Sequence, residues 1–122
     1  MTDIKCLDSS AWLEYYLNAH PTITALVDKG GLLYTSSLSF FEIKKKLLKS
    51  KKDFKELLQF IKERSIIIVP GAIICEKAAD VAIELQLAAI DALIYTTATM
   101  SNAELITADN DFRKLENVKI IS

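Results

Sequence analysis

The sequence predicts an α/β fold: a three-layer α/β/α sandwich in which helices cover both faces of a parallel sheet of four to five strands. Two observations predict this class. Short apolar segments alternate along the chain with longer segments of helical period. The short segments are also apolar throughout, which is typical of strands that are buried between two helical layers.

The first half of the chain contains two predicted strands and four predicted helices. Residues 4 to 7 form a short strand, and the helix that follows is expected to use Ser9 or Ser10 as its cap. His20-Pro21 and Gly30-Gly31 bracket a shorter helix. The remaining elements are a strand at 32 to 36 and helices at about 37 to 49 and 53 to 64.

The second half continues the alternation. Residues 66 to 70, IIIVP, form a strand that we expect to be buried on both faces. The other predicted elements are helices at 73 to 87 and 90 to 101, strands at 104 to 107 and 118 to 121, and a helical turn at 110 to 115. No internal repeat or linker divides the chain, so one domain is expected over residues 1 to 122.

The composition excludes several classes of protein. With 51% hydrophobic and 25% charged residues, the chain is not of the disordered or collagen-like kind. Its two cysteines, Cys6 and Cys75, form no C-x-x-C pair, so we expect buried free thiols and no zinc knuckle. The apolar stretch from 85 to 103 contains Asp91 and is predicted to lie in the core and not in a membrane. The first residues lack the pattern of a signal peptide, which predicts a cytoplasmic protein.

The charges are distributed unevenly. Residues 44 to 64 contain nine Lys or Arg and three acidic residues, whereas the rest of the chain is acidic. Such a basic segment can bind the phosphates of a polyanion, but it is equally typical of a solvated pair of helices. The sequence leaves these two interpretations open.

The acidic residues fall where an α/β protein places its ligands. Asp8 ends the first strand and Asp109 follows the fourth, and the carboxyl ends of parallel strands meet at one edge of the sheet. Carboxylates without His or Cys partners favour Mg²⁺ or Mn²⁺.

Each acid also has a structural explanation. Asp109 and Asp111 suit a turn, Asp91 suits a helix N-cap, and Glu42 suits an exposed pair with Lys46. A helical wheel places Glu42 away from Phe41, Leu47 and Leu48.

Other motifs are excluded. An EF-hand starting at Asp109 requires an oxygen ligand and a glycine where Arg113 and Lys114 stand. No glycine-rich phosphate loop occurs, and the lone His20 lies beside a proline in a predicted turn.

Four segments carry a resemblance to a known family. CLDSSAWL, LSFFEIKKKL, AAIDALIYTTA and LITADNDF occur in this order over the whole chain. Together they resemble the PIN-domain ribonucleases, especially the VapC-type toxins of toxin-antitoxin pairs. The resemblance implies a PIN-like fold and a Mg²⁺- or Mn²⁺-dependent endoribonuclease that cleaves single-stranded regions of RNA.

The resemblance also implies roles for individual residues. Asp8, Glu42, Asp91 and Asp109 match the acids that hold the metal and activate water, and Asp111 matches a fifth acid of some members. Ser9, Ser10 and Thr107 match hydroxyl positions near the metal. It further implies a homodimer and an inhibitory antitoxin, and under this interpretation Lys45, Lys46 and Lys49 would guide RNA. The alternatives are a non-catalytic binding or scaffold module and a housekeeping RNA-processing nuclease.

Overall fold

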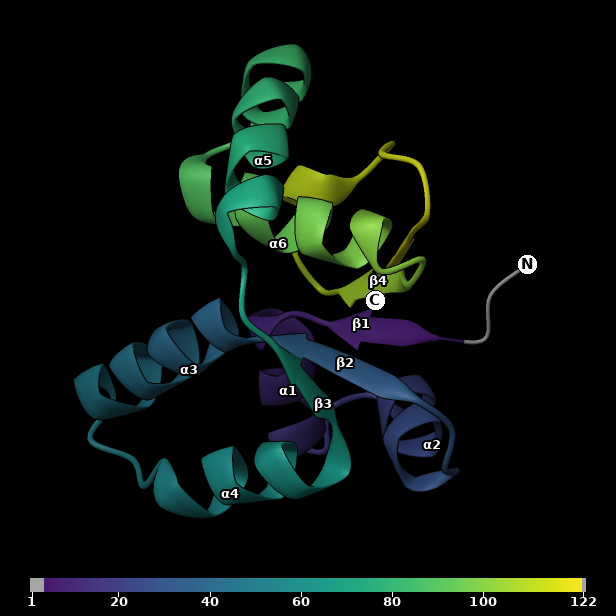
Figure 1. The fold of residues 1–122 in the computed structure, drawn as a ribbon. Coiled ribbons are helices and arrows are strands. Elements are labelled where there is room, and N and C mark those ends of the chain that lie inside the picture. Colours follow the sequence, from purple (N-terminus) through teal and green to yellow (C-terminus); the bar gives the residue numbers. More distant parts are fainter. Residues whose placement is uncertain (1–3, 122) are drawn as a thin grey trace.

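The computed structural model describes residues 4 to 121 and contains one five-stranded sheet (Figure 1). The strands follow the order β3-β2-β1-β4-β5, and all four neighbouring pairs are parallel. Their bounds are β1 Lys5–Leu7, β2 Leu33–Ser36, β3 Ile66–Ile68, β4 Glu104–Thr107 and β5 Val118–Ile120. The predicted parallel α/β sheet is therefore confirmed.

Within residues 4 to 121, six α-helices cover the two faces of this sheet (Figure 1). One hydrophobic cluster joins one face of the sheet to the first four helices, and a second cluster joins the other face to the last two. Neighbouring residues of β1 show the division, because Leu7 belongs to the first cluster and Cys6 to the second. The helices are α1 Ser9–Tyr16, α2 Pro21–Asp28, α3 Ser37–Lys49, α4 Lys55–Arg64, α5 Ala72–Leu85 and α6 Ala89–Met100.

The start of α1 differs from the prediction. Neither Ser9 nor Ser10 is the cap, because the N-cap is Asp8, whose Oδ1 accepts the amide hydrogen of Ala11 at 2.9 Å. The chain turns directly from β1 into α1, and the residue after the strand already has the extended backbone of a cap. Both serine hydroxyls are thereby available for other contacts.

The third strand also departs from the prediction. It ends at Ile68, and it is not buried on both faces, since Ile66 is 51% exposed. Val69, which follows it, is 71% exposed. The reason is the position of β3 at the edge of the sheet, where it pairs with β2 on one side only.

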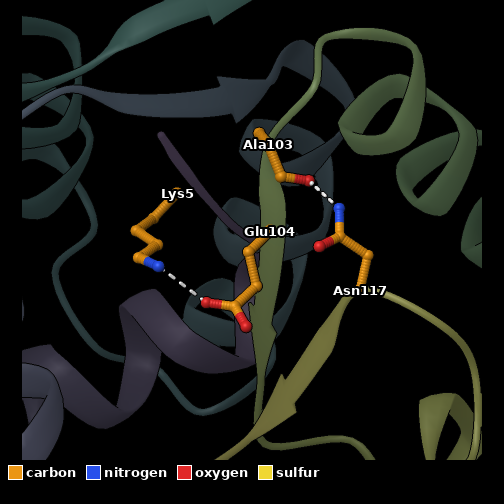
Figure 2. A network of polar contacts seen from close by, with 4 residues as sticks. All are labelled: Lys5, Ala103, Glu104 and Asn117. Carbon is orange, nitrogen blue, oxygen red and sulfur yellow. Dashed lines mark hydrogen bonds and ion pairs between the residues drawn. The ribbon is translucent and has the colours of Figure 1, made fainter. Parts of the chain in front are cut away.

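Strands β1 and β4 are held in register at their amino ends. Lys5 and Glu104 are partners across the two strands, and the Lys5 ammonium lies 2.7 Å from a Glu104 carboxylate oxygen (Figure 2). Asn117, which precedes β5, donates its side-chain amide to the Ala103 carbonyl at 3.0 Å (Figure 2). These contacts fix the relative heights of the strands whose carboxyl ends carry the predicted acids.

Helix α5 packs mainly against α6 and projects beyond the sheet (Figure 1). In the part of the chain that the structure describes, none of the individual helices combines the length and the apolar character of a membrane span. Helices α5 and α6 reach them only when taken together, and the angle between these two helices is 115°. Most residues of the central part of α6 are buried, as predicted for a core element. Cys6 is a buried free thiol, but Cys75 on α5 is exposed, contrary to the prediction.

Candidate functional site

The strand order reverses direction between β1 and β4, which is where open α/β sheets bind ligands. Asp8 follows β1, and Asp109 comes two residues after β4. Since the strands are parallel and paired in register, both acids lie at the carboxyl edge of the sheet. The topology thus places together two acids that are far apart in the sequence.

Asp8 is buried, with 4% of its surface exposed, and both oxygens of its carboxylate accept hydrogen bonds from the surrounding chain. Oδ1 accepts hydrogen bonds from the Ser10 hydroxyl at 2.7 Å and from the Ala11 amide. Oδ2 accepts the Thr107 hydroxyl at 2.5 Å. A buried carboxylate with this many donors is held in one orientation.

The hydroxyls of Ser10 and Thr107 tie the start of α1 to the loop after β4. Ser10 Oγ accepts the amide of Ala108 at 2.8 Å and lies 3.2 Å from Thr107 Oγ1. Thr107 Oγ1 also accepts the amide of Asp109 at 2.9 Å. Ser10 and Thr107 therefore form a hydrogen-bond network that links Asp8 with Asp109.

Glu42 reaches the same edge from α3. It is partly buried, and its Oε1 accepts the hydroxyl of Ser9 at 3.1 Å. Within residues 4 to 121 no ion pair joins Glu42 to Lys46, so the interpretation as an exposed helical pair is wrong. The physical reason is that α3 turns Glu42 toward α1.

Asp91 lies in the first turn of α6 and is not its cap. The N-cap is Ala88, and no side chain caps this helix. The N-cap interpretation of Asp91 is therefore wrong, because the helix begins at Ala89 and places Asp91 at its third residue. Its carboxylate is directed to the other acids.

Asp109 and Asp111 complete the group. Carboxylate oxygens of Asp91, Asp109 and Asp111 all lie within 4.8 Å of one another. Asp109 also caps the short 3₁₀ helix η1 Asn110–Phe112 by accepting the Asp111 amide at 2.9 Å, so the turn interpretation of this segment is correct as well. The resemblance implies only that Asp111 is a fifth acid of some family members, yet in the structure it belongs to the closest group of acids.

The acids influence one another electrostatically. The pKa of Asp91 is raised to about 6, chiefly by burial and further by the charges of Asp109, Asp111 and Asp8. The pKa of Asp8 is also raised to about 6, chiefly by burial, with the charge of Glu42 adding to the increase and its own hydrogen bonds opposing it.

Glu42 responds to the same surroundings. Its pKa is raised chiefly by burial, the Ser9 hydrogen bond opposes this rise, and Asp91 and Asp109 contribute to it. All five predicted acids therefore share one electrostatic environment, although Asp8 and Glu42 lie outside the closest group.

Two cavities flank the acids. One, of about 350 Å³, contains Asp91 and Asp111 together with Arg113. The other, of about 680 Å³, contains Glu42 and Asp109 together with apolar and basic side chains. This larger cavity, called the α3 groove below, is lined by Ser9, Ser10, Leu13, Phe41, Glu42, Lys45, Lys46, Lys49, Ile90 and Asp109.

The α3 groove contains residues that the sequence interpretation missed. The helical wheel sets Phe41 away from Glu42, but Phe41 is 64% exposed and lines the groove beside Glu42. Leu48 is likewise exposed, so of Phe41, Leu47 and Leu48 only Leu47 is buried. The consecutive phenylalanines Phe40 and Phe41 gave a usable signal, because neighbouring residues on a helix point about 100° apart and only one can face the core.

The set of donors suits a hard divalent cation. Carboxylate oxygens are the ligands that Mg²⁺ and Mn²⁺ prefer, and a cation offsets the repulsion between Asp91, Asp109 and Asp111. Both oxygens of Asp8 already accept hydrogen bonds, so Asp8 can contribute only its remaining lone pairs. The residues present fit such an ion.

The fold and the acidic edge define a class of α/β proteins, and comparison with known proteins identifies it. The family model for the PIN domain matches residues 5 to 118. The chain belongs to the PIN domain family, as the resemblance of the four sequence segments implied. No curated protein matches the chain.

Several solved structures have the same fold. A toxin-antitoxin complex from Klebsiella pneumoniae matches with a TM-score of 0.78 and 19% identity over 94% of this chain and 95% of that chain. VapBC2 from Rickettsia felis, bound to a DNA fragment from its promoter, matches with a TM-score of 0.77 and 22% identity over 97% of each chain. Mycobacterium tuberculosis VapC20, a toxin that cleaves the sarcin-ricin loop, matches with a TM-score of 0.68 and 15% identity over 90% of this chain and 92% of that chain.

Proposed function

We propose that this protein is a Mg²⁺- or Mn²⁺-dependent endoribonuclease that cleaves single-stranded regions of RNA. The observation that carries the proposal is the gathering of Asp91, Asp109 and Asp111 within 4.8 Å, with Asp8 and Glu42 beside them, at the carboxyl edge of a PIN fold. Because like charges at this separation are unfavourable without a cation, the arrangement supports a metal site and not a purely structural one.

In this proposal the five acids hold the ion, and their neighbours hold the acids. Thr107 and Ser10 orient the Asp8 carboxylate, and Ser9 orients that of Glu42. A bound divalent ion would lower the pKa of a water molecule and would stabilise the charge that develops on the leaving oxygen. The chain contributes fixed carboxylates that accept protons and keep the reacting groups in one geometry.

The basic side of the α3 groove is assigned to the RNA. Lys45, Lys46 and Lys49 line the same cavity as Glu42 and Asp109. An RNA phosphate bound by these lysines lies next to the acids, which reduces the repulsion that a polyanion meets there. This arrangement favours the polyanion interpretation of the basic segment over that of a merely solvated helix pair.

We further propose that the protein is the toxin of a VapBC-type pair, acts in the cytoplasm as a homodimer and is inhibited by an antitoxin. The support is the likeness of the whole chain to a toxin-antitoxin complex and to VapBC2. An exposed free thiol at Cys75 is compatible with a reducing compartment. Growth arrest on expression, relieved by the product of an adjacent gene, would distinguish a toxin from a housekeeping RNA-processing nuclease.

The central test is cleavage of a mixed single-stranded RNA pool by the purified protein with Mg²⁺, with Mn²⁺ and with EDTA. We expect cleavage only with a divalent ion. Asp109→Asn and Asp91→Asn should each lower the rate roughly a hundred-fold or more, as the loss of a charge-stabilising group does. The matched control is Asp80→Asn, which removes the same charge from an exposed position on α5.

Two outcomes would contradict the proposal. Cleavage that persists in EDTA would exclude the metal-dependent mechanism. A wild-type protein that binds RNA but does not cleave it with either ion would instead support a non-catalytic PIN-like binding module.

A further inference from the structure

Phe41 is an aromatic side chain left in solvent beside the acids. It is 64% exposed, although it lies on a helix whose next turn is firmly packed. Its neighbour Phe40 packs against the hydrophobic core, and Ile43 and Leu47 are buried in it. Packing of α3 therefore does not account for an aromatic residue at position 41.

The surroundings of Phe41 include charged side chains as well as apolar ones. It lines the α3 groove and directly precedes Glu42 in the sequence. The ammonium group of Lys45, one turn further along α3, lies 5.7 Å from the centroid of the Phe41 ring, within the range of a cation–π contact. A cation thus lies over one face of the aromatic ring at the wall of the groove.

The groove continues from this wall to the acids. Ile90, which directly precedes Asp91, lines the same cavity as Phe41. Phe41 and Ile90 are therefore two apolar side chains, each adjacent in sequence to one of the acids. A cavity of about 680 Å³ lies within the range of ligand sites of about 300 to 1,000 Å³.

We propose that Phe41 is a stacking platform for an unpaired base of the RNA strand, immediately beside the carboxylates. The inference rests on the proposed nuclease function and extends it to the recognition of the substrate. The base stacks on the ring, and Lys45, Lys46 and Lys49 contact the adjoining phosphates. Interleaved aromatic and basic side chains are the common solution for binding single strands.

The platform explains a preference for single-stranded RNA. Both faces of a base in a duplex are covered by its neighbours, so the Phe41 ring can stack only on a base that has left a helix. Stacking is tolerant of base identity, because every base has a π face. Phe41 is accordingly expected to select the strandedness of the substrate more than its sequence.

The charge of the groove favours RNA over a protein partner as its occupant. Three lysines and one exposed aromatic ring line it beside Glu42 and Asp109, and the lysines with the ring match a chain of phosphates that carries planar bases. An apolar helix of a partner protein would instead bury three lysine charges with only two acids of the groove to offset them. Capture of a protein by Phe41 is the competing result that the experiment distinguishes.

The experiment measures binding of a fluorescein-labelled oligouridine by anisotropy in EDTA, where metal-dependent cleavage is absent. Phe41→Ala should weaken binding roughly five- to a hundred-fold, the change that accompanies removal of one stacked base. Leu48→Ala is the matched control, because Leu48 is 54% exposed on the same helix but does not line the groove, and it should bind as the wild type does.

A second variant reports the stacking itself. Phe41→Trp should retain binding, and its indole fluorescence should be quenched by oligouridine but not by a blunt duplex RNA. The background emission of Trp12 should stay constant, since Trp12 is buried and its indole N–H donates to Thr35. If residue 41 had only a structural role, oligouridine would not quench the fluorescence of this indole.

The outcomes separate this inference from the function on which it rests. If the wild type binds oligouridine and Phe41→Ala binds equally well, the platform is wrong while the nuclease proposal is untouched. Weaker binding to a co-purified protein, with unchanged binding to RNA, would assign Phe41 to a protein interface. A wild type that neither binds nor cleaves RNA would overturn both proposals.

Discussion

The hydroxyl of Thr107 joins two acids that come from opposite ends of the chain. It donates to Asp8 Oδ2 and accepts the amide of Asp109 at 2.9 Å, and its residue is completely buried. Hydrogen bonds to a buried charged group are among the stronger ones in proteins, at about 1.5 to 3 kcal/mol each. The position of the acids is therefore fixed by a side chain that does not itself carry a charge.

Replacement of Asp91 distinguishes a cap from a member of a repelling cluster. A cap residue changed to alanine costs about 1 kcal/mol of stability. Because Asp91 makes no cap contact and its pKa is raised by burial and by three other acids, we expect Asp91→Ala to stabilise the metal-free protein at neutral pH. The midpoint of urea unfolding in EDTA measures this, and a lower midpoint than that of the wild type would contradict a net repulsion at Asp91.

The sequence pointed to the five acids and to their meeting at one edge of the sheet, but not to which of them lie closest together. Asp8 and Asp109 follow from the rule for strand ends, since each comes just after an apolar segment. The residues around Asp91 favour a helix cap, because an Asp near the start of a helix is a common N-cap, and the start of α6 at Ala89 is a property of the folded chain. The closeness of Asp111 to Asp91 depends on where η1 lies relative to α6, and the predicted helical turn at 110 to 115 does not specify this.

At the scale of elements, α3 carries both kinds of group that the proposed function needs. Its inner face packs into the core through Ile43 and Leu47, and its outer residues present Glu42 together with three lysines to one cavity. The helical period thus sets acid and base side by side at the mouth of the groove. The same helix therefore contributes one acid to the acidic site, which repels an RNA phosphate, and three lysines that attract it.

Neutralising the lysines of the α3 groove tests this assignment. The triple variant Lys45→Gln, Lys46→Gln and Lys49→Gln should weaken binding of single-stranded RNA and flatten its salt dependence. The slope of log K against log salt should fall by up to about 2, at about 0.7 for each phosphate that the variant no longer neutralises. Titration of labelled RNA at several salt concentrations measures this slope.

The control for that experiment has the same change of charge at a different place. Lys44, Lys51 and Lys55 are exposed in the same basic segment, but none lines the groove. Their joint replacement by glutamine should leave the slope nearly unchanged. An equal reduction in both triple variants would show that the segment acts through its net charge and that the groove has no special part.

The order of the elements could be predicted from the sequence, but their degree of burial could not. Segments of helical and strand period indicated all five strands and six helices within a few residues of their observed bounds. The exposure of Ile66 and Val69 escaped prediction, because an apolar strand at an edge has the same sequence pattern as one at the centre. Only the pairing order decides between them.

At the scale of the whole molecule, the sheet brings acids from four elements to one edge, and this concentration of charge must cost stability. Asp8 follows β1, Glu42 belongs to α3, Asp91 to α6 and Asp109 to the loop after β4. A fold that places them together in the absence of a cation stores electrostatic repulsion. The stability of the metal-free protein is therefore expected to depend on pH in a definite direction.

The raised pKa values set that direction. Asp8 and Asp91 have pKa values of about 6 in the folded protein, compared with an ordinary value of 3.8, so the folded state holds protons that the unfolded state has released. This contribution to stability is present in full below the unfolded pKa and is lost as the pH rises through about 6. We therefore expect the metal-free protein to be more stable near pH 5 than near pH 7.5.

Divalent ions should reverse the trend, because they bind the ionised carboxylates. We expect Mg²⁺ or Mn²⁺ to raise the melting temperature strongly near pH 7.5 and little near pH 5, with a gain of about 2.7 kcal/mol when the free ion is about a hundred times its dissociation constant. Thermal unfolding with EDTA and with each ion at both pH values measures this, and Asp109→Asn should greatly reduce the gain. A stabilisation by the ions that is equal at the two pH values would mean that they bind elsewhere than at the clustered carboxylates.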